Sequence, residues 1–220
     1  MSTSPKIAVV LAGCGRADGS EVFETVTALL AIAKNGGSYQ CFAPNIEQSA
    51  VVNILTGEKT NERRSVLIEA GRICRGDIKD LKEFNVKGFD AVIFPGGLGA
   101  VTNWCDYAVE GVNCTVNQDI NNTILKCYDN KLPIGAMCIA PVVVAKVLGG
   151  YGIKITIGSD EQTARAVEAM GAVNEVCQAT EIAVDEKHKI VTTPAYMMAH
   201  SITEVAEGAD KMVKAIMKML

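Results

Sequence analysis

The chain has 220 residues, of which 49% are hydrophobic and 21% charged, and its net charge is −4. This composition is typical of a globular domain long enough to bury a core, and the absence of a basic excess argues against a nucleic-acid partner. No apolar run reaches the roughly 18 residues that cross a bilayer. The N-terminus has neither a signal-peptide core nor an Arg-rich transit pattern, so we expect a cytoplasmic protein that binds no membrane.

Strand and helix patterns alternate along the first half of the chain. Short apolar runs are typical of buried parallel strands, and Ser20 is placed to cap the first helix, which Gly36 and Gly37 end. We expect strands over 6–11, 38–43 and 90–94, helices over 21–35 and 61–74, a short helical turn over 81–84, and irregular structure over 100–115.

The second half continues this alternation and contains a hairpin near its end. Ser159 and Gln162 have the spacing of a capping box, and Ser201 can cap the last helix. The alternation predicts an α/β fold with a doubly wound, mostly parallel sheet between helical layers (flavodoxin-like), in a single domain over 1–220. We expect helices over 116–128, 139–148, 159–170 and 201–218, strands over 134–137 and 154–157, and an antiparallel hairpin formed by 181–185 and 189–193.

A strand turns directly into a helix at Cys138. Such a turn is sharp, so the residues two before and two after its centre must be small, and here they are Ala136 and Ala140. Pro141 is tolerated because the first turn of a helix leaves its N–H groups unpaired. This nucleophile elbow sets the thiol beside the positive end of the helix, which favours the thiolate. We therefore predict a reactive thiol of lowered pKa; the alternative is a buried structural cysteine, one of eight in the chain.

Three loops are expected to meet at the carboxyl ends of the strands, where ligands bind in such sheets. They are 12–20, 95–99 and the elbow. The unhindered N–H groups of Gly96 and Gly97 can point at a developing oxyanion, and Ile139, the residue after Cys138, supplies the second natural donor. Without that role, the Pro-Gly-Gly sequence at 95–97 would be only a tight turn.

The first loop and helix supply the carboxylates Asp18, Glu21 and Glu24. Glu21 and Glu24 are three residues apart and share one face of the first helical turn. One of them could merely complement the helix dipole, whereas a buried carboxyl group close to a thiol can act as general acid and base. Glu24 is the more inward candidate because the apolar periodicity begins at Phe23.

Other motifs fit cofactor or metal chemistry poorly. The loop 13–19 follows a strand as a dinucleotide fingerprint does, but Asp18 occupies the place of its third glycine. The segment 56–60 lacks the first glycine of a P-loop, and no two cysteines have the Cys-x-x-Cys spacing. We therefore expect no cofactor, no metal site and reduced thiols, with His188 solvated and His200 at the surface.

Several stretches together resemble one family. The segments 136–140, 94–97 and 21–25 resemble the PfpI-type branch of the class I glutamine amidotransferase-like superfamily. The similarity is closer still to its enhancing-lycopene-biosynthesis (ElbB) members, at 11–21, 55–58, 137–141 and 192–196. The resemblance implies that Cys138 is the nucleophile and Glu24 the acid that touches its sulfur, with Glu21 in the same pocket and Gly97 and Ile139 lining the oxyanion site. It also implies a homodimer or larger assembly.

The function implied by this resemblance is that of a glutathione-independent glyoxalase with a link to isoprenoid biosynthesis. Cys138 would attack the aldehyde of a small carbonyl substrate, glyoxal or methylglyoxal, and Glu24 would move a proton between the adjacent carbons to give glycolate or lactate. Protease-like and amidotransferase relatives activate the cysteine with a histidine, directly after it or in a distant His-x-Glu. Here Ile139 follows Cys138 and neither motif is present, so we expect neither a protease nor a glutaminase. The alternative is a non-catalytic redox sensor or binding protein in which Cys138 is oxidised to a sulfinate.

Overall fold

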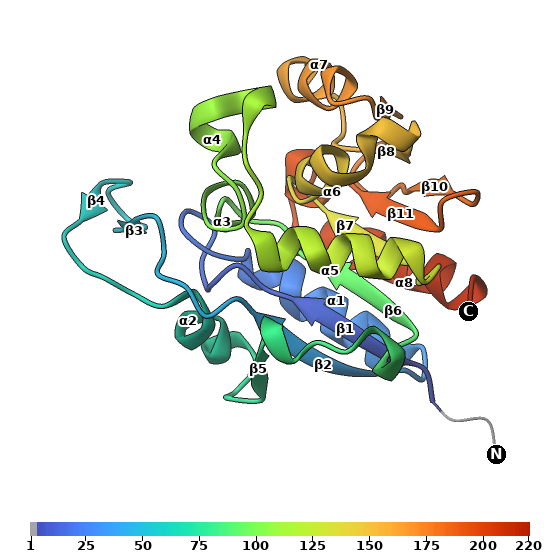
Figure 1. The fold of residues 1–220 in the computed structure, drawn as a ribbon, viewed down its shortest axis with the longest axis horizontal. Coiled ribbons are helices and arrows are strands. Elements are labelled where there is room, and N and C mark those ends of the chain that lie inside the picture. The colour runs from blue at the N-terminus through green and yellow to red at the C-terminus, as the bar shows by residue number, and fades with distance from the viewer. Residues whose placement is uncertain (1–3) are drawn as a thin grey trace.

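The computed structural model describes residues 4–220, and its centre is a seven-stranded sheet with the order β10-β11-β7-β6-β1-β2-β5 (Figure 1). Every neighbouring pair is parallel except β10 and β11. The predicted α/β fold with a mostly parallel sheet is therefore confirmed. The strands are β1 (Lys6–Val10), β2 (Ser38–Ala43), β5 (Ile78–Asp80), β6 (Ala91–Phe94), β7 (Ile134–Met137), β10 (Ala183–Asp185) and β11 (Ile190–Thr193).

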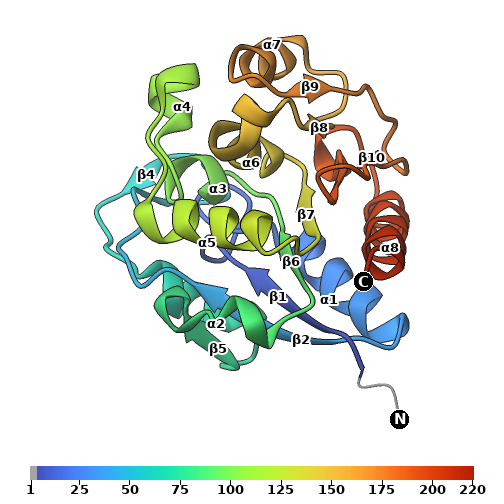
Figure 2. The same cartoon turned by 45° about the vertical axis from the view of Figure 1, so that its right-hand side comes forward.

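Helices cover both faces of this sheet (Figures 1 and 2). On one face α1 packs against α8, and on the other α5 packs against α6. The longer helices are α1 (Val22–Lys34), α2 (Val66–Ile73), α5 (Gln118–Asp129), α6 (Pro141–Leu148), α7 (Glu161–Ala169) and α8 (Ile202–Lys218). Two single-turn helices, α3 (Gly99–Thr102) and α4 (Tyr107–Glu110), lie between β6 and α5.

The central strands are apolar because helices bury them on both faces. In β1, all residues after Lys6 are fully buried, and β6 and β7 are buried along their whole length. A parallel strand in this position needs a continuous apolar run rather than an alternating one. The sequence had that pattern at each of these three places.

Several helix starts differ from the sequence-based expectation. Glu21, not Ser20, caps α1, and Ser20 instead accepts a hydrogen bond from the N–H of Ala12. Asp160, not Ser159, caps α7 by accepting from the N–H of Thr163. Helix α2 begins only at Val66, because residues before its cap Ser65 form a small hairpin and its return. The prediction that Ser201 caps α8 is confirmed, and Glu204 completes a capping box with it.

Three short pieces of sheet differ from the expectation, which placed a strand over 154–157 but did not predict its partner or the other two pieces. Strand β5 extends the main sheet beyond β2, and β8 (Lys154–Ile155) pairs with β9 (Val173–Asn174) in a sheet of its own. Strands β3 (Val51–Val52) and β4 (Lys59–Thr60) form a hairpin that extends away from the body of the molecule in Figure 1.

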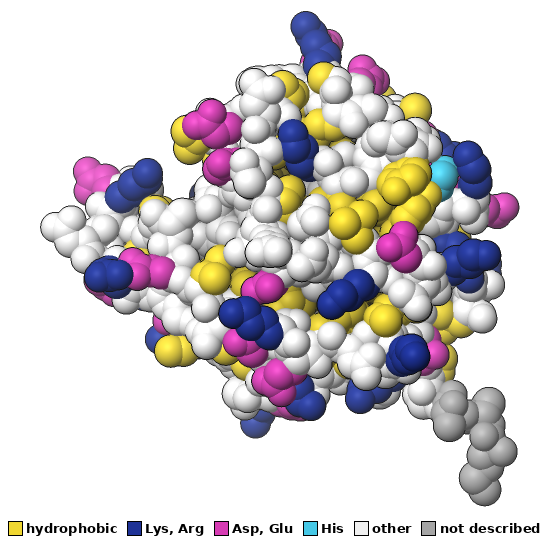
Figure 3. Space-filling view, in the orientation of Figure 1, with side chains coloured by type: hydrophobic (Ala, Val, Ile, Leu, Met, Phe, Trp, Pro, Cys, Tyr) yellow, Lys and Arg dark blue, Asp and Glu magenta, His cyan; other side chains and the backbone are white. Residues whose placement is uncertain are grey.

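Charge is not gathered in one place on the visible face of the molecule. On the face drawn in Figure 3, basic and acidic side chains are interspersed without a large patch of either sign. Within residues 4–220, every helix is too short or too polar to cross a membrane.

Candidate active site

The turn between β7 and α6 places Cys138 in a left-handed backbone conformation, with φ 57°. This conformation is uncommon for a residue with a side chain and marks the strained turn of a nucleophile elbow. Ala136 and Ala140 on either side are fully buried, so larger side chains would not fit there. The N–H of Cys138 donates to the carbonyl of Thr193 over 3.0 Å, which ties the turn to β11.

Glu24 reaches the elbow from the first turn of α1 and is completely buried. Its two carboxyl oxygens accept backbone hydrogen bonds, Oε2 from Gly96 over 3.0 Å and Oε1 from Tyr196 over 3.2 Å. The carboxyl group also forms a side-chain hydrogen bond with the thiol of Cys138. Four segments that are far apart in the sequence therefore meet at this one carboxyl group.

Burial shifts the ionisation of both groups in the same direction. Removal from water, with the charge of Glu21 in addition, raises the pKa of Glu24 to about 7, although hydrogen bonds from Cys138 and two backbone N–H groups oppose the rise. Burial and the neighbouring Glu24 raise the pKa of the Cys138 thiol well above its usual value. The predicted lowering of the thiol pKa is therefore wrong, because the helix end and nearby N–H groups are outweighed by burial and a carboxylate. The thiol is protonated and donates to Glu24.

Gly97 and Ile139 both direct backbone hydrogen bonds to the sulfur of Cys138. Their N–H groups are thus placed around the atom at which a substrate would be attacked. Gly96 differs from the expectation, because its N–H is occupied by Glu24. Its role is instead steric: a Cβ atom at Gly96 would lie 2.5 Å from the Cβ of Cys138.

The thiol opens into a pocket of about 470 Å³ that contains four of the residues selected from the sequence: Cys138, Glu21, Gly97 and Ile139. Glu21 caps α1 by accepting from the N–H of Glu24 over 2.7 Å, while its side chain still lines the pocket. The remaining lining residues are Arg16, Leu98, Asp160, Thr163, Tyr196 and Met197.

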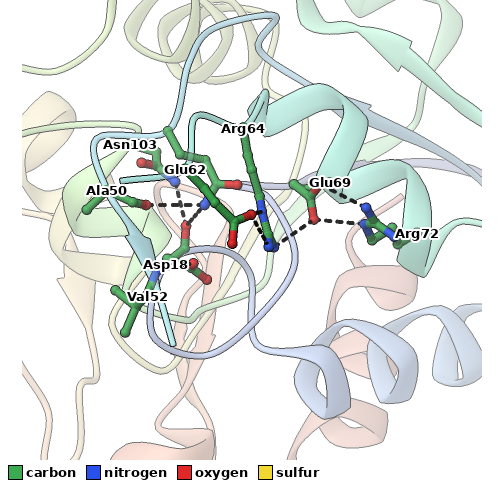
Figure 4. A network of polar contacts seen from close by, with 9 residues as sticks. Asp18, Ala50, Val52, Glu62, Arg64, Glu69, Arg72 and Asn103 are labelled. Carbon is green, nitrogen blue, oxygen red and sulfur yellow. Dashed lines mark hydrogen bonds and ion pairs between the residues drawn. The ribbon is translucent and has the colours of Figure 1, made fainter. Parts of the chain in front are cut away.

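Asp18 does not line the pocket, but its contacts position the loop that carries the lining residue Arg16. Its carboxylate accepts from the N–H of Val52 over 2.8 Å, and its carbonyl accepts from the side chains of Gln48 and Asn103 (Figure 4). In the same figure Arg64 lies between Glu62 and Glu69. The contacts of Asp18 tie the loop 12–20 to the segments that carry Val52 and Asn103.

Arg16, Asp160, Thr163 and Tyr196 were not among the pocket residues selected from the sequence. Arg16 lies in the loop 12–20, which was considered for its carboxylates and as a cofactor motif; its carbonyl accepts from the N–H of Leu98 and so joins two of the converging loops. Tyr196 lies in the single turn that follows β11. The stretch 192–196 was the available signal for it, because it matched the family signature.

Neither histidine lines the pocket. His188 is partly exposed in the β10–β11 turn, and its Nδ1 lies 2.7 Å from the hydroxyl of Tyr128. Over residues 4–220, no group of three or more His, Cys, Asp and Glu side chains is placed to hold a metal ion.

Comparison with known proteins gives relatives along nearly the whole chain, although no family model matches it. The rat "ES1 protein homolog, mitochondrial" is 38% identical over 97% of this chain and 84% of its own length. The human "Glutamine amidotransferase-like class 1 domain-containing protein 3, mitochondrial" is 37% identical over 97% of this chain and 83% of its own. Their names place those two proteins in mitochondria; the cytoplasmic location expected for this chain stays a prediction.

A solved structure has the same fold as this chain along nearly its whole length. The isoprenoid biosynthesis protein with an amidotransferase-like domain from Ehrlichia chaffeensis is 33% identical and superimposes with a TM-score of 0.92, covering 98% of this chain and 99% of that one. Fold, sequence identity and coverage thus lead to one conclusion. The chain belongs to the ES1 family of class I glutamine amidotransferase-like proteins.

Proposed function

We propose that this protein is a cysteine-dependent enzyme that acts on small carbonyl compounds, of the glutathione-independent glyoxalase type found among ElbB-like, PfpI-type proteins. The observation that carries the proposal is the contact between the Cys138 thiol and the buried Glu24 carboxyl group, with the N–H groups of Gly97 and Ile139 directed at the same sulfur. A nucleophile, a proton carrier and two oxyanion donors around one pocket are the groups that carbonyl chemistry requires.

The reaction begins when the sulfur of Cys138 adds to the aldehyde carbon and its proton passes to the Glu24 carboxylate. The resulting hemithioacetal oxygen lies near the N–H groups of Gly97 and Ile139, which stabilise its negative charge. Glu24 gives the thiol proton to the hemithioacetal oxygen and, ionised again, takes the proton from the hemithioacetal carbon, so that an enediolate forms with its negative charge on the neighbouring oxygen. Glu24 returns the proton to the neighbouring carbon, and the hydroxyl proton of the first carbon passes to the oxygen of the second, which gives a thioester of the 2-hydroxy acid. Water cleaves this thioester, releasing glycolate or lactate and restoring the thiol.

Histidine-dependent hydrolysis of peptides or glutamine fits this pocket less well. None of the residues that line it is a histidine, and Ile139 follows the cysteine. Among the groups that shift the pKa of Cys138, one side chain forms a hydrogen bond with its sulfur, and that side chain is Glu24. A carboxyl group with a pKa of about 7 suits proton transfer at neutral pH.

The first experiment measures glycolate from glyoxal and lactate from methylglyoxal for the wild type, Cys138→Ser and Glu24→Gln. We expect both variants to lose about 10²-fold or more in kcat/KM, whereas Cys127→Ala, at a buried cysteine in α5, keeps the wild-type value. Glutamine can accept only one of the two backbone hydrogen bonds that Glu24 accepts, so a melting curve must show that the variant is folded. Equal product from wild type and Cys138→Ser would rule out the proposal.

The pH dependence provides a second readout of the same mechanism. Since Glu24 must be ionised to take the thiol proton, kcat/KM is expected to rise with pH up to about 7 and then level off. A profile without this step would remove Glu24 from the proton-transfer role.

A redox sensor is the second candidate, and the observation that favours it is the neutral carboxyl group beside the sulfur at pH below about 7. A protonated carboxyl group can donate a hydrogen bond to a sulfinate on Cys138. Selective oxidation of Cys138 by modest peroxide, without any product from either aldehyde, would favour the sensor over the enzyme.

We also propose a homodimer and, from the words used for the Ehrlichia protein, a link to isoprenoid biosynthesis. The dimer is supported by an exposed apolar stripe on α1 formed by Phe23, Val26 and Leu30, which are 46–49% exposed. These residues share one helical face, because they are spaced by three and four positions.

A further inference from the structure

A second thiol site lies at the base of the segment that carries α4. Cys105 forms an antiparallel bridge with Val116, and the N–H of Asn117 donates to the carbonyl of Trp104 over 2.7 Å. The chain leaves the body of the protein at Cys105 and returns at Cys114. These contacts hold the two ends of the excursion 105–114 against each other.

Cys105 and Cys114 are neighbours across this base, because Cys105 lies opposite Val116, two positions beyond Cys114. Each thiol acts on the pKa of the other, the Cys105 thiol donates to the carbonyl of Ala100 over 3.6 Å, and both residues are buried, at 5% and 3% exposure. Cys114 lies just under the surface, because Asn113 and Thr115 on either side of it are exposed. Two thiols held in this way can be joined without unfolding the chain around them.

The two thiols differ in how easily they ionise. Burial raises the pKa of Cys105 to about 12. Burial and the carboxylate of Asp106 also raise the pKa of Cys114, but the ammonium group of Lys146 and the thiol of Cys105 both oppose that rise. Lys146 is held nearby by a 2.8 Å hydrogen bond from its Nζ to the carbonyl of Val112. Cys114 is therefore the thiol that reacts first, and Cys105 is the one that resolves it.

We propose that Cys105 and Cys114 form a reversible disulfide when the protein meets a peroxide. The Cys114 thiolate attacks one oxygen of hydrogen peroxide, which gives a sulfenic acid and, after protonation of the leaving hydroxide, water. The Cys105 thiol then attacks that sulfur, the S–O bond breaks, and a second water leaves. The two thiols are oxidised and the peroxide is reduced. This inference is independent of the function proposed for Cys138.

The chain contains a matched pair that should remain reduced. Cys41 and Cys74 form a side-chain hydrogen bond, and Cys41 is only 1% exposed in the central sheet. The groups that act on Cys41 are Cys74, burial and the carboxylate of Asp77, all of which raise its pKa, and none of them is a cation. Proximity of two sulfurs is therefore common to both pairs, whereas a cation acts on Cys114 and none acts on Cys41.

The disulfide would restrict the motion of the segment 105–114, which contacts residues that line the Cys138 pocket. Tyr107 of α4 forms a side-chain hydrogen bond with Thr163 of α7, and Thr163 and Asp160 both line that pocket. Figures 1 and 2 show α4 and α7 at the same end of the molecule. Closing the loop between residues 105 and 114 reduces the freedom of the unfolded chain, so the oxidised protein should melt at a higher temperature.

Proteolytic cleavage can separate Cys105 and Cys114 into different peptides, so that a disulfide between them can be detected. Between Lys87 and Lys126 the sequence contains one Glu, Glu110, and no other Lys. Combined cleavage after Lys and after Glu therefore yields the peptides 88–110 and 111–126, each with a single cysteine. Folded, reduced protein is treated with equimolar hydrogen peroxide, remaining thiols are alkylated, and the digest is analysed without reductant. We expect the two peptides to be joined, and to separate on reduction.

Four variants make the assignment specific. Cys114→Ser and Cys105→Ser should lose the joined peptides and the rise in melting temperature, whereas Cys138→Ser and Cys41→Ser should keep both. The inference is overturned if both peptides of the wild type are recovered alkylated after peroxide treatment, or if Cys41 is joined to Cys74 at the same rate. A joined peptide without a higher melting temperature would overturn the clamping role.

Discussion

At the scale of single residues, the site depends on a carboxyl group and a thiol that lie in contact and whose pKa values are both raised by burial. Glu24 has no contact with water, and each of its oxygens already accepts a backbone hydrogen bond. Cys138 adds a third partner. Two acidic groups in such contact resist carrying charge at the same time, so above about pH 7 the pair holds one negative charge, which rests on Glu24, and below that pH it is neutral.

This pair predicts a pH dependence of stability. The pKa of Glu24 rises from 4.5 when it is solvated to about 7 in the folded protein, so the folded state binds the proton more tightly. The resulting stabilisation is complete below pH 4.5 and is lost as pH rises to about 7. We expect the free energy of unfolding to fall by about 2–3 kcal/mol between pH 5 and pH 8 from this group alone.

Urea unfolding of the wild type and of Glu24→Gln at both pH values isolates the effect. The variant has no carboxyl group at this position, so the difference in free energy of unfolding between the two proteins should change with pH. The destabilisation caused by glutamine itself is the same at both pH values and does not affect this change. A difference that stays the same at pH 5 and pH 8 would show that Glu24 titrates at its ordinary value.

At the scale of elements, the turn after β6 is as closely fitted as the elbow itself. A methyl group at Gly96 would lie 2.6 Å from Oε2 of Glu24 and 2.5 Å from the Cβ of Cys138. We expect Gly96→Ala to slow alkylation of Cys138 and to lower kcat/KM by about 10²-fold, with a loss of about 1–3 kcal/mol in stability.

Gly88→Ala is the matched control for this substitution. Gly88 lies in a single turn before β6, and a Cβ atom there would meet nothing within 4 Å. It should leave the alkylation rate, the activity and the melting temperature close to those of the wild type. If the two alanine variants behaved alike, Gly96 would be no more than a loop residue.

The sequence was most informative where a single local pattern decides the structure. Continuous apolar runs predicted β1, β6 and β7, and two small residues around Cys138 predicted the elbow. The same patterns could not predict β5, β3 or β4, which have two or three residues each and too few side chains to show a period.

The site was predictable only in part, for a related reason. The inward position of Glu24 follows from the periodicity of its own helix. In contrast, the attachment of Asp18 to Val52, the use of the Gly96 N–H by Glu24 and the raised pKa of Cys138 depend on segments that meet only in the folded molecule. Tyr196 illustrates the limit, since its N–H reaches Glu24 across 172 positions of sequence.

At the scale of the whole molecule, the outer face of α1 remains uncovered. Phe23, Val26 and Leu30 project from the same helix whose inner face carries Glu24. Beside them, Leu30 and Lys34 line a groove with Asp210 and Lys214 of α8. An apolar stripe with a charged border is typical of a surface that a second subunit covers.

Light scattering after size-exclusion chromatography tests the proposed homodimer. The wild type should have twice the mass of one chain, and Leu30→Glu should shift it to the mass of a monomer, because a charge would be buried in the contact. Leu55→Glu, at the exposed tip of the β3–β4 hairpin, should remain a dimer. A monomeric wild type would contradict the assignment of this face.

The hydrogen bond from Tyr196 to Glu24 also bears on how the protein is made in the cell. Synthesis proceeds from the N-terminus, so the elbow at Cys138 leaves the ribosome about 60 residues ahead of Tyr196, a delay of roughly 3–12 s. During that interval Glu24 lacks one of its backbone donors, and β11, whose Thr193 accepts from the N–H of Cys138, is absent. The reactive centre is therefore completed among the last events of biosynthesis, and a chain that stops early carries the cysteine without its chemistry.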